Sequence, residues 1–382
     1  MKRILQVNVD DNGLNGVYAF VMNILRNVGH DVSIDLCAFE KFQSESNMQE
    51  IHALGGTVHY CGYQGNIFIK QWTSLRNYYR LISQNGYDVV HVHSDVAYKL
   101  FLYAFLAKLG GVPNILIHSH ATGIDGKHRR IKWFLHHVAK PLLPLCTDVY
   151  LACSRLAGRW MYDEKILNGK DFSVIYNGID VAKFSFDEGK RKKKRQELNL
   201  QDEVVIGHIG RFAYQKNHAF LIAIFKEIVN IKGKAVLMLI GDYIGDDYYW
   251  NEAKRQVSEY GLDDCVRFMG LRKDVPDLMQ AMDVFLLPSR FEGLPIAGVE
   301  AQAAGLPCFF SSEITEETKL SSRAYFLSLQ DAPAVWAKRI LEELSVERKK
   351  ADDEIEAAGY DVRATVRFTE KLYSMDKGIL LQ

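Results

Sequence analysis

Short apolar runs alternate with amphipathic stretches along nearly the whole chain. Apolar runs of this length are typical of buried strands, and the helical spacing of the stretches between them is typical of helices that cover a sheet. In the first half, the predicted strands are 3–9, 31–39, 57–61, 88–93, 115–120 and 148–154, and the predicted helices are 17–28, 68–83, 98–109 and 131–143. Strands separated by helix-length crossovers form a parallel, doubly wound sheet.

The alternation restarts after a short strand-like segment at 172–176 and a linker that we place at 175–185. The second set of predicted strands is 204–210, 235–241, 266–270, 284–288 and 308–311, and the helices between them are 217–231, 248–260, 274–282 and 295–304. We therefore predict an α/β protein of two Rossmann-like, doubly wound domains, 1–178 and 179–361, which face each other across a cleft. No strand follows the helical spacing of the terminal segment, 362–382, so its helix must pack on structure already formed.

The stretch 285–301 predicts a strand, a loop and a helix in direct succession. In a parallel sheet, ligands bind outside the carboxyl ends of the strands, where helix N-termini favour anions. Glu292 in the loop and Glu300 on the second turn of the helix are predicted to border one ligand. Its anionic part would lie on the amides of Gly293 and Leu294. A nucleotide sugar carries both the hydroxyls and the phosphates that such a site suits.

Two loops that follow a first strand are candidates for binding phosphate. In the second half, Arg211 follows a strand ending in Gly210, and Lys216 lies at the start of the next helix, so both could stabilise a leaving diphosphate. The alternative is a pair of ordinary surface cations. In the first half, loop 11–16 contains two glycines, which allow close backbone approach at Gly16, although such a turn is also common without a ligand.

Two pairs of histidines end neighbouring predicted strands. His91 and His93 end one strand, His118 and His120 end another, and the alternation of a strand places each pair on one face. Metal binding is one interpretation, but neither pair has a closing Cys or carboxylate motif. A neutral histidine that hydrogen-bonds a sugar hydroxyl is the interpretation we favour, with His120 in that role.

Two basic segments differ in character. Segment 127–140 combines five cations with Trp, Phe and Leu and contains no acid. It is either a domain helix with a solvated basic face or an interfacial helix resting on anionic lipid. The run 190–195 consists of six cations, and we predict a solvated linker helix without a function there.

Composition excludes several classes of protein. The chain has 382 residues, 48% of them hydrophobic and 25% charged, as expected for a globular protein of two domains. Lys+Arg and Asp+Glu both total 47, so no overall field selects nucleic acid as a partner. The first apolar run is too short for a signal peptide, and no later window suits a membrane span. Six scattered cysteines without CxxC spacing favour reduced thiols, so we expect a cytoplasmic protein.

Four motifs together carry a resemblance to a known family. They are 174–180 at the domain junction, Gly210-Arg211 with Lys216, 239–242, and Glu292 paired with Glu300 after a Pro-Ser strand end. With these motifs the chain resembles the GT-B-fold retaining glycosyltransferases of family 4, the glycosyl transferases group 1. It is most similar to their bacterial exopolysaccharide and capsule branch. The similarity covers essentially the whole chain and is strongest over 175–311.

The resemblance implies specific roles. The first domain would bind the acceptor, the second the nucleotide-sugar donor, and the last helix would return to the first domain. Arg211 and Lys216 would hold the diphosphate, Glu300 the ribose hydroxyls, Glu292 the transferred sugar, and segment 270–275 the nucleobase. The donor-binding set implied is Gly16, Gly210, Arg211, Lys216, Arg272, Val275, Glu292, Gly293, Leu294, Pro295 and Glu300, and the catalytic set is His120, Arg211, Lys216 and Glu292.

The chain departs from the family pattern in two loops. Residues 13–16 read Gly-Leu-Asn-Gly where many members have adjacent glycines, which weakens the phosphate assignment there. The segment 242–247 lacks the second Gly-Pro pair that often follows this strand.

The predicted activity is transfer of a hexose from a nucleotide diphosphate sugar, UDP-linked, to a saccharide acceptor in cell-surface polysaccharide synthesis. The acceptor is expected to be lipid-linked at the inner membrane surface, which segment 127–140 would contact. No Asp-x-Asp pattern occurs, so no metal or other cofactor is expected. Two alternatives stay open: an isomerase of the UDP-sugar 2-epimerase kind, and a non-catalytic nucleotide-sugar-binding partner of a transferase. The oligomeric state is not predicted.

Overall fold

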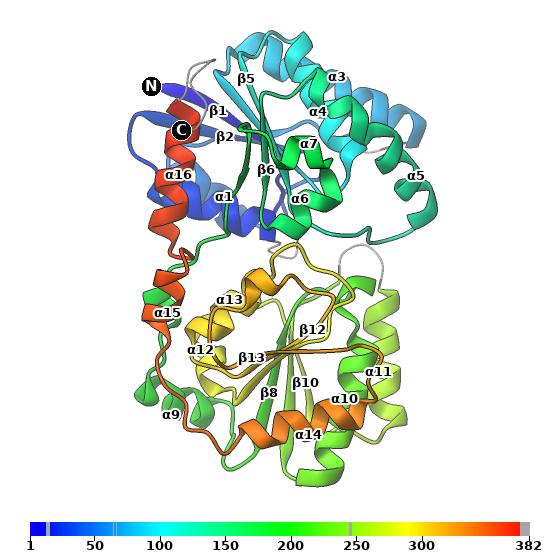
Figure 1. Cartoon of the computed structure of the whole chain (residues 1–382), viewed down its shortest axis with the longest axis vertical. Helices are drawn as coiled ribbons and strands as arrows, with labels where there is room; N and C mark the ends of the chain where they lie inside the picture. The colour runs from blue at the N-terminus through cyan, green and yellow to red at the C-terminus, as the bar shows by residue number, and fades with distance from the viewer. Residues whose placement is uncertain (13–15, 64, 66, 244–246, 375–382) are drawn as a thin grey trace. The chain divides into compact units, whose positions relative to one another are not determined.

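The computed structural model describes residues 1–12, 16–63, 65, 67–243 and 247–374. They form two compact units, one made of Met1–Gly178 with Val362–Gln382 and the other of Ile179–Asp361. Each unit contains one sheet whose paired strands are all parallel (Figure 1). Two parallel, Rossmann-like sheets are the predicted fold class.

The first unit has a seven-stranded sheet in the order β3-β2-β1-β4-β5-β6-β7. Its strands are β1 (Lys2–Val7), β2 (Val32–Ala38), β3 (Val58–Tyr60), β4 (Val89–Ser94), β5 (Asn114–Ser119), β6 (Val149–Ala152) and β7 (Phe172–Val174). Its helices are α1 (Gly16–Asn27), α2 (Glu45–Ala53), α3 (Ile67–Asn85), α4 (Ala97–Leu109), α5 (Arg129–Ala139), η2 (Lys140–Leu145), α6 (Arg155–Met161), α7 (Glu164–Leu167) and α16 (Val362–Ser374).

Helices α1 and α16 pack together over one face of this sheet, although they lie at opposite ends of the chain (Figure 1). Their apolar side chains share a core with the strand residues that point to the same face. This core includes Ile4, Phe20, Ile24, Leu36, Val89, Leu116, Leu151, Leu372 and Tyr373. The helical spacing of the terminal segment is therefore explained by burial against α1 and β1.

The second unit has a six-stranded sheet in the order β10-β9-β8-β11-β12-β13. Its strands are β8 (Val204–Ile209), β9 (Ala235–Ile240), β10 (Val266–Gly270), β11 (Val284–Leu287), β12 (Cys308–Ser311) and β13 (Ala324–Leu327). Its helices are α8 (Val181–Phe184), α9 (Glu188–Glu197), η3 (Tyr214–Lys216), α10 (His218–Lys232), α11 (Tyr248–Glu259), α12 (Val275–Ala281), α13 (Ile296–Ala303), η4 (Glu316–Thr318), α14 (Pro333–Glu343) and α15 (Asp352–Ala357). Buried residues of α10, α11 and α14 form one core against this sheet.

One predicted helix is wrong in its last four residues. The pattern predicts a helix over 131–143, but α5 ends at Ala139 and a 3-10 helix, η2, follows. Pro141 and Pro144 lie in η2. A proline lacks the N–H of an α-helical hydrogen bond and clashes with the preceding turn, so the α-helix cannot continue there.

The prediction of a solvated helix at 190–195 is also wrong. This run lies on α9, where Arg191 Nη2 is 2.6 Å from Asp283 Oδ1 and Arg195 donates to the carbonyl of Ala281. Lys194 Nζ lies 3.2 Å from Asp274 Oδ2. Half of the run therefore attaches α9 to the segment around α12 and the start of β11.

The elements β13, α14 and α15 were not predicted from the sequence. The strand β13 has four residues, three of them only partly buried. All six cysteines are free, and five of them are buried. None of the helices in the described ranges combines the length and hydropathy that crossing a bilayer requires.

Candidate active site

The order of strands reverses at β8 and β11, which are neighbours in the second sheet. Val284 pairs with Ile206 and Phe285 with Gly207, so both strands end at the same edge. The loops that follow them hold the two motifs singled out from the sequence. Ligands of open α/β sheets bind at such a reversal point, outside the carboxyl ends of the strands.

An ion pair joins the two loops. Lys216 Nζ lies 2.6 Å from Glu292 Oε1, and both side chains are largely buried. Gln215 donates from Nε2 to Glu292 Oε2 at 2.9 Å and to the carbonyl of Phe291 at 3.0 Å. Both oxygens of the Glu292 carboxylate therefore accept hydrogen bonds, and this group is held in place rather than poised as a free base.

A second set of contacts fixes the same two loops. The amide of Arg290 donates to the carbonyl of Gln215 at 2.8 Å, and Arg290 Nη2 donates to Asn217 Oδ1 at 2.7 Å. Asn217 in turn donates to the carbonyl of Pro288 at 3.2 Å. The Arg290 guanidinium lies 4.6 Å from the centre of the Tyr214 ring. The loop after β8 is thus preorganised by the loop after β11.

Gly210 allows the side chain of Lys216 to fold back over the end of β8. A Cβ atom at Gly210 would lie 2.8 Å from Lys216 Cε, and one at Gly241 would lie 2.1 Å from the Gly210 carbonyl oxygen. Gly241 also has a φ of 140°, which side-chain-bearing residues rarely adopt. The two glycines permit this close approach, so the first residue of the Gly210-Arg211 motif serves packing.

Arg211 is the cation of the site that the protein itself leaves unpaired. Its side chain is partly buried, and it forms no hydrogen bond or ion pair with any residue in the described part of the chain. The loop after β11 leads directly into α13. Pro295 precedes the first residue of this helix, and no side chain caps its N-terminus. An uncapped helix N-terminus and a free guanidinium both favour an anionic ligand.

Glu300 lies on the second turn of α13, as predicted. Its side chain is partly buried, and it has no hydrogen-bond partner among the described residues. Burial raises the pKa of Glu300 to about 7, although the positive charge of Lys183 on α8 lowers that pKa in part. A carboxyl group left in this state is suited to accept hydrogen bonds from ligand hydroxyls.

The other residues predicted to bind the donor follow strands of the same sheet in the sequence. Arg272 donates from Nε and Nη2 to the Asp274 carboxylate at 2.8 and 2.7 Å, so its charge is already matched. Val275 is the first residue of α12. Gly293 and Leu294 are buried, and in the sequence they lie between Glu292 and α13. Any nucleobase contact made by Arg272 therefore requires sharing its guanidinium with Asp274.

The histidines of β4, His91 and His93, lie together with His118 of β5 and with His120, which follows it; strand alternation predicted that each pair shares one face. The rings of His91 and His93 are 4.2 Å apart, and those of His118 and His120 are 4.0 Å apart. The Phe20 ring of α1 packs edge-on against all four imidazoles. Burial lowers the pKa of His91 and of His120 to about 3, so both rings stay neutral at ordinary pH.

Three of these side chains, His91, His93 and His118, offer ring nitrogens within 4.8 Å of one another, which is a geometry that could hold a metal ion. Both nitrogens of His93 already form hydrogen bonds, to His120 Nε2 at 2.9 Å and to Gln6 Oε1 at 2.7 Å. A metal at this place would have to displace one of them. The geometry therefore favours a hydrogen-bonded cluster.

Gly16, the predicted phosphate contact of the first unit, is the exposed first residue of α1. The preceding part of its loop, residues 13–15, lies outside the described residues, as does segment 244–246. Sequence reasoning missed Gln215, Arg290 and Asn217. No motif marks them, since their partners are more than 70 residues away in sequence.

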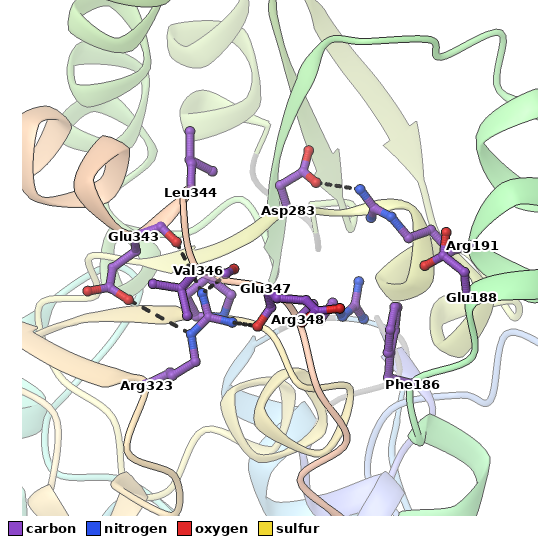
Figure 2. A pocket seen from close by; sticks show the side chains of 11 residues that line it. Phe186, Glu188, Arg191, Asp283, Arg323, Glu343, Leu344, Val346, Glu347 and Arg348 are labelled. Carbon is purple, nitrogen blue, oxygen red and sulfur yellow. Dashed lines mark hydrogen bonds and ion pairs between the residues drawn. The ribbon is translucent and has the colours of Figure 1, made fainter.

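A cavity of about 460 Å³ lies at the opposite edge of the second sheet, beside residues that precede β11 and β12. Arg191 pairs there with Asp283, and Arg323 lies 3.8 Å from Glu343 (Figure 2). The Arg348 guanidinium donates to four main-chain carbonyls. Because these arginines already have acids or carbonyls as partners, they serve the fold, and the phosphate site is better placed at the reversal point.

Comparison with known sequences covers both halves of the chain. A model of glycosyltransferase family 4 matches residues 15–183, and a model of glycosyl transferases group 1 matches residues 203–345. The chain is 30% identical to the putative glycosyltransferase EpsF of Bacillus subtilis, over 98% of this chain and 97% of that protein. It is 25% identical to the capsular polysaccharide biosynthesis glycosyltransferase CapH of Staphylococcus aureus, over 92% and 93%.

A third relative is the UDP-Gal:alpha-D-GlcNAc-diphosphoundecaprenol alpha-1,3-galactosyltransferase of Escherichia coli. It is 31% identical over 64% of this chain and 62% of that protein. Among solved structures, HepE of Anabaena in complex with UDP-glucose aligns with a TM-score of 0.79 at 19% identity, over 98% of this chain and 100% of that one. The fold is therefore GT-B. With the full-length match to EpsF, this shows that the chain belongs to the glycosyl transferases group 1, family 4, among glycosyltransferases of exopolysaccharide and capsule synthesis.

Proposed function

We propose that this glycosyltransferase moves a hexose from a UDP-sugar to a lipid-linked saccharide in cell-surface polysaccharide synthesis. The observation that carries the proposal is the reversal point of the second sheet. There, the unpaired Arg211 lies on the same edge as the Lys216–Glu292 ion pair and the partnerless Glu300. Such a set suits a diphosphate and hydroxyl groups together. The galactosyltransferase relative, which acts on a diphosphoundecaprenol-linked sugar, supports the choice of donor and acceptor.

In this proposal, leaving-group stabilisation supplies most of the catalysis. Arg211 and Lys216 would take the charge that develops on the diphosphate as its bond to the anomeric carbon breaks. Glu292 would hold Lys216 and contact the transferred sugar, with the amides of Gly293 and Leu294 beside it. The acceptor oxygen would attack from the same face, so that the configuration is retained. Its proton would pass to the departing diphosphate oxygen.

The remaining roles follow the same proposal. Glu300 would accept hydrogen bonds from the ribose hydroxyls, and His120 would contact the transferred sugar near the reacting centre. Two side-chain cations and the α13 N-terminus would meet the diphosphate charge, so we propose that transfer needs no metal ion. Activity is then expected to persist in EDTA.

The test is transfer by the purified chain. UDP release and product mass would be followed with a panel of UDP-hexoses and a diphosphate-linked lipid saccharide. Arg211→Ala is expected to lower kcat by about 10²- to 10³-fold, since one charge-stabilising donor is lost. Arg255→Ala is the matched control, because this exposed guanidinium on α11 pairs with Glu252 and Glu259, away from the candidate site. A wild-type rate for Arg211→Ala would refute the roles. Conversion of the donor without acceptor would support the isomerase instead.

We also propose that the first unit rests on an anionic membrane through α5, η2 and α4. Five apolar side chains of α5 are exposed, between 42% and 61%, and they are Ile131, Trp133, Phe134, Leu135 and Val138. Of the residues of α5, only His136 and Ala139 are buried. Leu145, Phe105 and Leu109 are exposed on the neighbouring η2 and α4. A helix that exposes its apolar side chains to this extent suits a lipid interface.

Charge favours anionic lipid as the occupant of this surface. Lys127, Arg129 and Arg130 are exposed at the start of α5, and segment 127–140 contains no acid. Cations near an anionic membrane contribute about 1 kcal/mol each. A lipid-linked acceptor would place the substrate at the same membrane surface.

Vesicle flotation tests the membrane proposal. The chain is expected to float with phosphatidylglycerol vesicles at low salt, and less at high salt or with neutral vesicles. Replacing Trp133 and Phe134 by Ser should abolish flotation while the fold is kept. Trp72→Ser is the matched control, because Trp72 is 73% exposed on α3 of the same unit. Equal flotation of all variants would contradict the proposal.

A further inference from the structure

A chain of three hydrogen bonds leads from the last helix to His120, and a fourth joins the same helix to His91. Tyr373 on α16 accepts from Gln6 Nε2 at 2.5 Å and lies 2.9 Å from His91 Nδ1. Gln6 Oε1 lies 2.7 Å from His93 Nε2, and His93 Nδ1 lies 2.9 Å from His120 Nε2. Gln6, His91, His93 and Tyr373 are fully buried.

With the Gln6 amide oxygen facing His93, the direction of the whole chain follows. An amide oxygen only accepts, so the proton on His93 must lie on Nε2, where it donates to Gln6 Oε1. A neutral imidazole carries one N–H, so His93 Nδ1 is an acceptor. His120 must then donate from Nε2. Its Nδ1 is left without a proton and can only accept.

The same reasoning explains why Tyr373 matters. In the structure, the Gln6 nitrogen donates to the Tyr373 hydroxyl, and the amide oxygen then faces His93. Tyr373 in turn can donate its own proton to His91 Nδ1. Without the hydroxyl, the amide can turn over and present its nitrogen to His93. That turn would reverse every proton position along the chain and place the proton of His120 on Nδ1.

We propose that Gln6 and Tyr373 are positioning residues, which hold His120 as the Nε2–H tautomer so that its Nδ1 accepts a hydrogen bond from a sugar hydroxyl. This inference rests on the proposed function, in which His120 contacts the transferred sugar. It assigns to the last helix a part in the site of the first unit. The ligand class it specifies is a hydroxyl donor, as opposed to an anion or a carbonyl.

Two further observations support the assignment. Burial keeps the ring neutral, since it lowers the pKa of His120 to about 3, so the tautomer rather than the charge decides what His120 can bind. The edge-on packing of Phe20 against His93 and His120, with centroids 5.9 Å away in both cases, restrains the rings from turning over. His118, whose ring nitrogens have no partner among the described residues, is not part of the chain.

The tautomer can be read directly by NMR. In the full chain labelled with ¹⁵N-histidine, two-bond ¹H–¹⁵N correlations distinguish the Nδ1–H from the Nε2–H form. The wild-type protein is expected to show His93 and His120 as Nε2–H. Tyr373→Phe should move His120 toward Nδ1–H and lower kcat about tenfold, the effect of roughly one net hydrogen bond, with the donor KM within about twofold.

Matched variants separate this role from stability. Tyr162→Phe also removes a buried hydroxyl of the first unit, one that donates to the carbonyls of Leu151 and Ile117, but it lies outside the chain. It should leave the tautomer and kcat unchanged. Gln6→Glu keeps an acceptor toward His93 and should preserve the tautomer, whereas Gln6→Leu should lose it.

A wild-type His120 observed as Nδ1–H would overturn the inference, even in an active enzyme. Unchanged tautomers in Tyr373→Phe would overturn it as well. The proposed function fails on different evidence, namely the absence of any transfer by the wild-type chain or a wild-type rate for Arg211→Ala. The NMR readout needs no substrate, so the two failures are distinguishable.

Discussion

Among single residues, Glu300 is a site residue whose burial reduces the stability of the fold as the pH rises. Its carboxyl group is partly buried without a hydrogen-bond partner in the described part of the chain, and burial raises its pKa from 4.5 to about 7. Between these two pH values, the unfolded chain ionises this group while the folded chain keeps it protonated. The contribution of Glu300 to stability is therefore complete below about pH 4.5 and declines as the pH rises to about 7.

Glu300→Gln should remove this dependence, because an amide does not ionise. The variant is expected to gain about 2 kcal/mol in unfolding free energy relative to wild type between pH 4.5 and 7.5, a value reduced from the full shift because the side chain is partly exposed. Urea denaturation at several pH values measures the gain. A difference between the two proteins that stays constant with pH would contradict the assignment. Above pH 7, UDP binding should weaken in the variant, since the ribose hydroxyls lose the ionised carboxylate as an acceptor.

The charged residues of the candidate site were predictable from the sequence, and the residues that hold them in place were not. Arg211, Lys216, Glu292 and Glu300 follow strand ends, so their common edge follows from the alternation of strands and helices alone. Gln215 carries no such mark, because its bond to Glu292 spans 77 positions and depends on how the two loops fold. The same holds for the contact between Gln6 and Tyr373, 367 positions apart. Long-range hydrogen bonds leave no periodic trace in a sequence.

Among the elements, α9 shows a charge run acting as an attachment. Arg191 lies 2.6 Å from Asp283 and donates to the carbonyls of Gln280 and Met282. Arg191→Ala should therefore lower the free energy of unfolding by about 2 kcal/mol, because a partly buried carboxylate loses a charged partner. Lys192→Ala is the control from the same run: this side chain is 73% exposed and lies 3.8 Å from Glu188, so the expected change is within about 0.5 kcal/mol. Equal losses in urea denaturation would contradict the distinction.

The strands and most helices were predictable because burial imposes a period on the chain. Where the prediction was wrong, local chemistry or distant partners decided the outcome. Pro141 and Pro144 change the type of helix after Ala139 in spite of a continuous helical spacing. The pattern of α5 suited both a solvated face and a lipid-facing one. The exposed fractions of Trp133 and Phe134 favour the lipid-facing interpretation, since they show that no other described segment covers these rings.

For the whole molecule, the two units carry different parts of the proposed chemistry. All the candidate contacts to the nucleotide, apart from Gly16, come from the second unit. The histidine cluster and its anchor on α16 belong to the first unit. Substitutions in the second unit should therefore change nucleotide affinity as well as the rate of transfer, whereas substitutions in the histidine cluster should change the rate alone.

The binding of UDP alone, measured by calorimetry, tests this division. Arg211→Ala should weaken UDP binding about 10- to 100-fold, because a hydrogen bond to a charged group contributes roughly 1.5 to 3 kcal/mol. His120→Ala should leave the UDP affinity within about twofold and lower kcat instead, because UDP lacks the sugar that His120 is proposed to contact. The double variant should show additive effects on UDP binding, since no direct coupling is expected for a ligand held by one unit. A loss of UDP affinity in His120→Ala as large as that in Arg211→Ala would show that the first unit also binds the nucleotide.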